Sequence, residues 1–382
     1  MSNNKLIEVR NIEYLPALQS LDLSSNQINR VYPGPLRNLR SLKLSNNRLL
    51  AFDVDGFPSL RLLYLDKNCL STIDGLDKCH HLETLSVREQ APLQVDDGAA
   101  SYFDIDLNAL KDIRKLFLSS NRLAERVLSP SRPLLTLQLL DAASCALPSL
   151  PSHFGTTFPN LRVLNLNFNA LSSVEALAGM NGLSRLTLVG NRIGKLRKFC
   201  QVLNRLGRTG TSGPSSVKTV DLRGNPLTVG FYPPPISGSG RGGGNNKPLE
   251  SNPDAERGVQ SEQRTTALAS FGHCVDIAGP EDLFDCDKIE GWNDMEIDDP
   301  YTVPPADMEA DQKYLSSLDE STKLRRMAVE LMLYTGTGGA IQVLDGLALR
   351  SVLERGGTDV DRVWGKLEEL GVLKKSQSLR HD

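Results

Sequence analysis

The chain has 382 residues, a formal net charge of −3 at pH 7, and 40% hydrophobic but only 5% aromatic residues. This charge balance argues against a nucleic-acid-binding protein, which normally carries a basic face. No apolar run approaches the roughly 20 residues of a membrane span, and the first residues lack the pattern of a signal peptide, so no membrane partner is expected. The six cysteines show no Cys-x-x-Cys spacing, which predicts reduced thiols in a soluble, intracellular protein.

One motif recurs along the first 230 residues. It begins as Leu18-x-x-Leu21-x-Leu23-x-x-Asn26-x-Ile28 and repeats over residues 39–49 and 60–70. The Leu-x-Leu pair has the period of a strand, and the Asn can bond the backbone of the turn that comes after it. This is the leucine-rich-repeat pattern. Later copies centre on Leu85, Leu116, Leu140, Leu164, Leu186 and Val220, with Gln90 and Cys145 in place of the turn Asn in two of them.

These repeats predict the fold class, an α/β repeat solenoid: a curved leucine-rich-repeat array with a parallel concave sheet over residues 1–230. Residues 231–312 are low in complexity and then acidic, so we expect a disordered linker there. Residues 313–382 should form a C-terminal helical cap. We expect Ser317 to open its first helix, a last repeat strand near Leu344, and a capping helix over 358–370.

No catalytic set of nucleophile, base and acid can be assembled, so the sequence predicts a protein that is not an enzyme. His80 and His81 beside Cys79 lack a second ligand pair, so neither a metal nor a cofactor is expected. Ser129-Pro-Ser-Arg132 matches the preference of cyclin-dependent kinases. Ser129 is therefore a candidate phosphorylation site, although motifs this short also arise by chance.

The concave face is the expected binding surface. Residues that flank the inward leucines should line it, and on strands three to seven they combine apolar side chains with a basic rim. The alternative is that the insertion around residues 96–106 folds over this face. The candidate partner-binding residues are Leu62, Tyr64, Arg88, Lys115, Phe117, Leu139, Val163 and Arg185.

Two longer stretches go beyond a generic repeat. Residues 221–235, Asp-Leu-Arg-Gly-Asn-Pro-Leu-Thr-Val-Gly-Phe-Tyr-Pro-Pro-Pro, close the array, and residues 314–326 read Tyr-Leu-x-x-Leu-Asp-Glu-Ser-Thr-Lys-Leu-Arg-Arg. With Asp299-Pro-Tyr, Val343-Leu-Asp-Gly-Leu, Val363-Trp364 and residues 370–373, they resemble the C-terminal half of the fungal spindle-pole-body scaffold of the septation initiation (mitotic exit) network. This family is related to animal centriolin, and the likeness covers nearly the whole chain.

The resemblance implies a non-enzymatic platform in the cytoplasm, at the cytoskeletal microtubule-organising centre known as the spindle pole body. The implied partners are a spindle-pole-body anchor, a GTPase-activating complex, a small GTPase and a Mob-bound kinase. Family members also carry a long phosphorylated N-terminal region, which this sequence lacks, so a fragment of a longer protein is expected. The alternative function is a general leucine-rich-repeat adaptor, such as a protein phosphatase 1 regulatory subunit.

Overall fold

The computed structural model describes residues 2–32, 34, 36–91, 102–180, 182–206, 215–233 and 306–369. Met1–Phe231 and Pro304–Asp382 form one compact unit, which contains the repeats and the C-terminal helices. Most of the expected linker, including Trp292 and Tyr301, lies outside the described residues, as do Cys274, Cys286 and residues 92–101 of the insertion.

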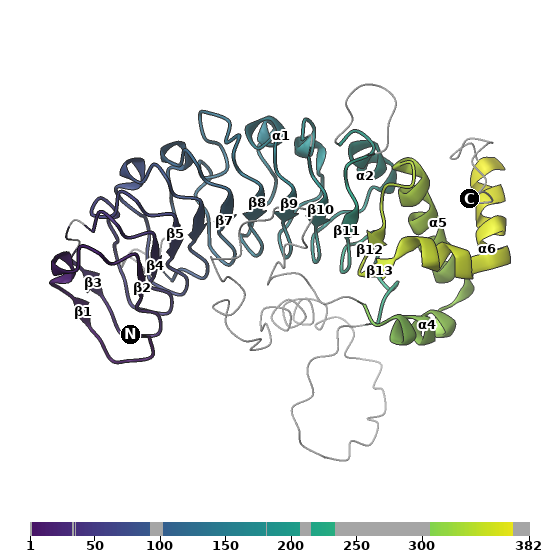
Figure 1. Ribbon diagram of the computed structural model, residues 1–382. Helices are drawn as coiled ribbons and strands as arrows, with labels where there is room; N and C mark the ends of the chain where they lie inside the picture. Colours follow the sequence, from purple (N-terminus) through teal and green to yellow (C-terminus); the bar gives the residue numbers. More distant parts are fainter. Residues whose placement is uncertain are drawn as a thin grey trace, which may run out of the picture. The chain divides into compact units, whose positions relative to one another are not determined.

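A single parallel sheet runs through the array. Its strands lie side by side along a curved stack, with helices α1 and α2 on the opposite face (Figure 1). In the described part of the chain it has eleven strands, and only the last one is antiparallel. They are β2 (Ser20–Asp22), β4 (Ser41–Lys43), β5 (Leu62–Tyr64), β6 (Thr84–Ser86), β7 (Lys115–Phe117), β8 (Leu139–Asp141), β9 (Val163–Asn165), β10 (Arg185–Thr187), β11 (Thr219–Asp221), β12 (Val343–Leu344) and β13 (Leu347–Ala348). The predicted repeat solenoid is confirmed.

The remaining elements connect the strands. Near the N-terminus, β1 (Glu8–Val9) pairs with β3 (Arg30–Val31) in a separate two-stranded sheet. The opposite side of the array carries short helical turns, as the sequence between the strands predicts. These are Ile12–Tyr14, Leu76–Lys78, Leu107–Ala109, Glu175–Leu177, α1 (Phe154–Thr157) and the longer α2 (Leu196–Leu203).

Stacked leucines form the core. The central leucines of neighbouring strands pair in register, for example Leu63 with Leu42 and Leu85, and each of these three is at most 1% exposed. Because each repeat buries its leucines only against its two neighbours, the array is stable only as a stack. Removing one such side chain, as in Leu63→Ala, should cost about 2–5 kcal/mol.

A second ladder, of polar side chains, closes the turns. Asn68 Nδ2 donates to three backbone carbonyl oxygens at 2.8–3.2 Å, and its Oδ1 accepts from Leu49 N at 3.0 Å. Gln90 makes the same bonds with a side chain one methylene longer, donating to Leu65 O at 2.9 Å and accepting from Leu70 N at 3.1 Å. Cys145 donates its thiol to two carbonyl oxygens at 3.3 Å, and burial raises its pKa. Both departures from Asn therefore preserve the turn.

Three helices close the C-terminal end, and two of them differ from expectation. Ser317 does not open a helix; it ends α4 (Met308–Ser317), an element that the sequence did not predict. The next helix, α5 (Glu320–Gly336), is capped by Asp319, which accepts from the hydroxyls of Ser321 and Thr322 and from Thr322 N. These bonds lower the pKa of Asp319, because they stabilise its charged form. Asp319 caps α5 in place of Ser317 because it is adjacent to the helix and its ionised carboxylate can accept more hydrogen bonds than a serine hydroxyl.

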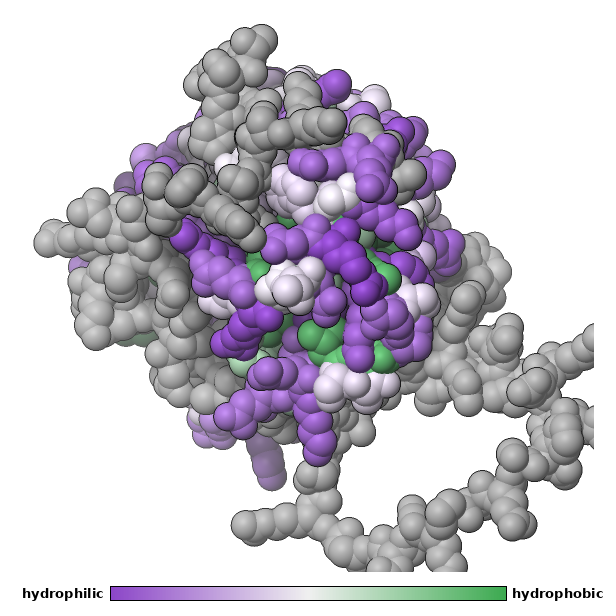
Figure 2. Space-filling model, turned by 90° about the vertical axis from the view of Figure 1, so that its right-hand side faces the viewer, coloured by the Kyte–Doolittle hydropathy of each residue, from purple (hydrophilic) through white to green (hydrophobic). Residues whose placement is uncertain are grey.

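The last helical element contains the expected capping helix over 358–370 as its second segment, preceded by a segment that the sequence did not predict. It spans α6 (Leu349–Glu369) and is interrupted at Gly357, whose φ of 46° and ψ of −123° are open to glycine but costly for other residues. Val360 and Val363 are buried, and α6 packs against α5, which in turn packs against α2. The end of the molecule that carries these helices is largely hydrophilic, with small hydrophobic patches (Figure 2). A polar outer surface over an apolar stack is what a terminal cap requires.

A buried ionic cluster fastens this cap to the array. Arg326 on α5 is 1% exposed and binds the Asp311 carboxylate of α4 through two hydrogen bonds, at 2.9 and 2.7 Å. Its other donors reach Glu330 Oε1 at 2.8 Å and the backbone oxygen of Phe231, at the end of the repeats, at 2.9 Å. Desolvation raises the pKa of the fully buried Glu330, although Arg326 opposes that shift. We name Asp311, Arg326 and Glu330 the cap cluster.

Candidate partner-binding surface

The sheet register aligns the concave side chains in rows, as the repeat spacing predicts. The last residues of β2 and of β4 to β11 pair one with the next. This central row is Asp22, Lys43, Tyr64, Ser86, Phe117, Asp141, Asn165, Thr187 and Asp221. The row beside it holds Leu62, Lys115, Leu139, Val163 and Arg185. Seven of the eight candidate residues thus fall on two adjacent rows, and Arg88 lies just beyond β6.

Half of the candidates are buried, which the sequence did not predict. Phe117, Leu139 and Val163 are only 3%, 2% and 6% exposed, and Arg88 is 4% exposed. One cause lies in the rows themselves, since these side chains project from adjacent strands about 4.8 Å apart and shield one another. The Arg88 guanidinium also covers the Phe117 ring, 4.2 Å from its centroid. Phe117 therefore lies beneath the accessible concave surface, although the sequence places it among the residues that line that face.

Charges on this face are held by specific contacts. Arg88 Nε lies 3.5 Å from Asp141 Oδ2, and both side chains are almost fully buried. Asp66 accepts from the Ser86 hydroxyl at 2.6 Å and from Arg88 N at 2.8 Å. These contacts pre-organise the arginine over the aromatic ring, because a buried charge is stable only when it is paired.

Four candidates remain partly accessible. Leu62, Tyr64, Lys115 and Arg185 are half-buried, and the first two lie side by side on β5. The Lys43 ammonium lies 5.9 Å from the centre of the Tyr64 ring. Desolvation by burial lowers the pKa of Lys115. The accessible part of the candidate surface is thus a mixture of apolar and basic side chains.

Ser129 lies on the other side of the array, in the connection between β7 and β8. It is half-buried, its amide donates to Arg126 O at 2.9 Å, and the next residue, Pro130, is buried. The next turn is fixed by Asn108 Oδ1, which accepts from Ser131 N at 2.8 Å. Because kinases bind substrates in extended form, phosphorylation of Ser129 would require local opening of this loop. Mass spectrometry of the protein from mitotic cells would test the candidate site directly.

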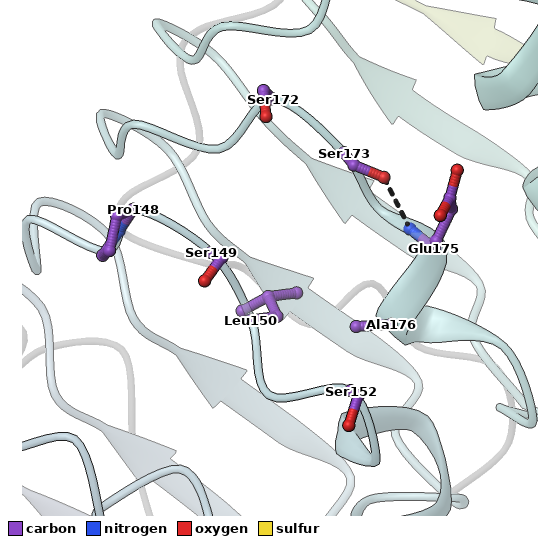
Figure 3. Close-up of a pocket in the computed structure, with 8 residues that line it drawn as sticks. All are labelled: Pro148, Ser149, Leu150, Ser152, Ser172, Ser173, Glu175 and Ala176. Carbon is purple, nitrogen blue, oxygen red and sulfur yellow. Dashed lines mark hydrogen bonds between the residues drawn. The ribbon is translucent and has the colours of Figure 1, made fainter.

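A hollow between connecting segments of the repeats does not resemble an active site. It measures about 320 Å³ and lies between two adjacent connections (Figure 3). Its four serines come from two connections, with Ser149 and Ser152 on one and the adjacent Ser172 and Ser173 on the next. Ser173 Oγ accepts from Glu175 N at 3.2 Å. Glu175, its one titratable group, is exposed and pairs with Lys198 at 3.2 Å. The lining residues are Pro148, Ser149, Leu150, Ser152, Ser172, Ser173, Glu175 and Ala176.

The described ranges hold neither a metal-binding cluster nor a membrane-spanning helix. No group of three or more His, Cys, Asp and Glu side chains there could hold a metal ion. His81 instead lies 3.8 Å from Asp112, at an exposed position. None of the described helices combines the length and the apolar character needed to cross a membrane.

Comparison with known proteins supports the repeat assignment. Models described as leucine-rich repeat match residues 17–39, 38–60 and 136–193. The septation initiation network scaffold protein cdc11 of Schizosaccharomyces pombe is 36% identical over 181 residues, which is 47% of this chain and 16% of cdc11. Mouse podocan is 28% identical over 250 residues, 56% of this chain and 37% of podocan.

Among solved structures, human 5T4 (Wnt-activated inhibitory factor 1) matches with 24% identity and a TM-score of 0.37, over 59% of this chain and 76% of that structure. The chain spans less than half the length of the two curated relatives, cdc11 and podocan. The match to cdc11 confirms the resemblance to the septation-network scaffold, but it covers 47% of this chain and not nearly the whole of it, as the motifs had suggested. The chain contains leucine-rich repeats and is similar in sequence to part of that scaffold.

Proposed function

We propose that this chain acts as a non-enzymatic scaffold of the septation initiation network, docking at the spindle pole body and recruiting signalling components there. The observation that carries the proposal is the 36% identity to cdc11 over 181 residues, because cdc11 is named as the scaffold of that network. A capped repeat array fits such a role, since solenoids offer extended surfaces on which several proteins can assemble. The recruited components would be small GTPase regulators, a small GTPase and a Mob-bound kinase.

The concave candidates supply the contact surface in this proposal. Leu62, Tyr64, Lys115 and Arg185 would contact a partner directly, while Arg88, Phe117, Leu139 and Val163 would support them from below. Aromatic and basic side chains at the centre of a contact commonly dominate its affinity. A partner with an apolar segment flanked by carboxylates would complement both features of the surface.

Localisation and partner identity can be tested together in fission yeast. The chain, fused to a fluorescent protein, should concentrate at spindle pole bodies, and a pull-down from mitotic extract should recover network components. Recovery of a protein phosphatase 1 catalytic subunit without network components would support the general adaptor instead. A diffuse signal with neither set of partners would contradict both functions.

The contact surface needs a matched pair of variants. Tyr64→Ala with Lys115→Glu changes the half-buried concave face, and Tyr14→Ala with Lys195→Glu makes the same chemical change at exposed positions in connecting segments. We expect the concave pair to lose at least about tenfold in partner recovery, as hot-spot losses above about 2 kcal/mol would give. Both variants must first show equal thermal midpoints. Equal recovery from two folded variants would remove the concave face from the proposal.

A further inference from the structure

A row of residues immediately before the strands forms a feature of its own. In every repeat, the backbone N–H of this residue donates to the carbonyl oxygen of its counterpart in the previous repeat, at 2.7–2.9 Å. The sheet register therefore extends by one residue toward the start of each strand. We name this the leading row: Gln19, Arg40, Arg61, Glu83, Arg114, Gln138, Arg162, Ser184, Lys218 and Gln342.

The leading row is basic on a chain that is acidic overall. It carries five cations and one anion, a net charge of +4, whereas the whole chain has a net charge of −3. All five cations are exposed. The row beside it on the sheet adds Lys115 and Arg185, with no acid. Positive charge is thus concentrated along one edge of the array.

Contacts within the fold do not account for these cations. Arg61 pairs with Glu83 at 2.8 Å, but no side-chain hydrogen bond or ion pair joins Arg114, Arg162 or Lys218 to another described residue. The neighbouring polar residues, by contrast, have structural roles. Thr136 Oγ1, for example, donates to the backbone oxygen of the preceding repeat at 2.8 Å. Like charges along one edge repel each other, so a ligand that neutralises them would be favoured.

The spacing of the cations specifies the shape of that ligand. Arg61, Arg114, Arg162 and Lys218 precede β5, β7, β9 and β11, which are alternate strands of the sheet. Strands about 4.8 Å apart place these four charges at intervals of roughly 9.6 Å. A polyproline II segment rises about 3.1 Å per residue with three residues per turn, so every third side chain recurs on one face after about 9.3 Å.

We propose that the leading row binds an extended acidic segment of a partner protein, with a carboxylate at about every third residue. A nucleic acid fits less well. In a duplex each strand carries a phosphate about every 3.4 Å of helix axis, a much denser array than these cations, and proteins that bind single strands add aromatic platforms that the leading row lacks. This surface lies beside the concave candidates but does not depend on the septation-network function.

The test is fluorescence anisotropy with the full chain and three labelled probes. The first is a proline-rich peptide of about twelve residues with glutamate at every third position, and the second contains the same residues with the glutamates in one block. The third is a single-stranded oligonucleotide of similar length. We expect the spaced peptide to bind at least about tenfold tighter than the other two, with a Kd that rises with salt.

Two matched variants assign the binding to this edge. Arg114→Glu with Arg162→Glu reverses two leading-row charges, and Arg48→Glu with Arg192→Glu reverses two exposed arginines that come directly after turn Asn residues. Both change the net charge equally. We expect the first to weaken spaced-peptide binding at least about tenfold and the second less than about twofold. Equal losses in the two variants, equal affinity for the two peptides, or tighter oligonucleotide binding would each overturn the proposal.

Discussion

The cap cluster gives a sharp test of what holds the C-terminal helices in place. Replacing Asp311 with Ala would remove two hydrogen bonds from a guanidinium that is 1% exposed and that also binds Glu330 and the Phe231 backbone oxygen. Breaking one side of a buried ion pair typically costs about 3–5 kcal/mol, because the remaining charge cannot be solvated. We expect a loss of this size, concentrated in the unfolding of the cap.

Tryptophan fluorescence can report on the cap selectively. The chain has two tryptophans, and Trp364 on α6 donates to Glu368 at 2.7 Å. In a Trp292→Phe background, urea unfolding followed by Trp364 should show the loss in Asp311→Ala. Circular dichroism would monitor the repeats. Arg350, in an exposed pair with Glu354 at 2.9 Å, provides the control, and Arg350→Met should leave the midpoint nearly unchanged.

The decisive comparison replaces the whole cluster. If the cost arises from an orphaned charge, then Asp311→Leu, Arg326→Met and Glu330→Leu combined should restore most of the stability lost in Asp311→Ala. A loss below about 1 kcal/mol in Asp311→Ala would refute the reasoning, since the ion pair would then not be effectively buried. A triple variant as unstable as the single one would show that packing, not charge, is the cause.

Buried groups in the repeats and in the cap cluster give three more measurable effects. Asn68→Ala should cost about 1–3 kcal/mol in chemical unfolding, because the buried Leu49 N–H loses its acceptor, whereas the three carbonyl oxygens each keep a second donor. Phe117→Ala should cost about 3–5 kcal/mol, as large buried side chains do, and the half-buried Tyr64→Ala clearly less. Because the folded pKa of Glu330 is raised, its stabilising contribution is complete below the unfolded value of about 4.3 and is lost as the pH rises through the folded pKa. The advantage of Glu330→Gln over the native chain in unfolding free energy should therefore grow with pH.

The repeats could be predicted because their signals are local. A Leu-x-Leu pair fixes which side chains point inward, and a turn residue three positions later fixes where the strand ends. Gln90 and Cys145 can replace the turn Asn because each places a hydrogen-bond donor near the equivalent backbone carbonyl oxygens. Because the motif recurs along the chain, matching its copies was enough to align the strands correctly.

The cap was predicted less well because its determinants are far apart in the sequence. Asp311 belongs to an acidic stretch whose composition predicts a solvated segment. It is nevertheless buried, because it pairs with Arg326, fifteen positions later in the sequence. Composition alone cannot reveal a pair whose members lie on different helices. Helix α4 was not predicted because the ionic contact of Asp311, and not a buried apolar face, holds it against the rest of the fold.

The candidate surface shows a different limit of sequence reasoning, because pointing outward from a strand is not the same as being exposed. Phe117 points away from the leucine core as predicted, but its neighbours and Arg88 leave it 3% exposed. The leading row was not identified from the sequence, because its residues stand one position before each strand and so outside the inward and outward positions of the strand itself.

Lys115 comes directly after Arg114, so a partner that reached both rows would contact exposed charge first and half-buried side chains second. Reversing Arg114 should then slow association, whereas truncating Tyr64 should speed dissociation, and kinetic measurements on the two variants would separate the contributions of the two rows.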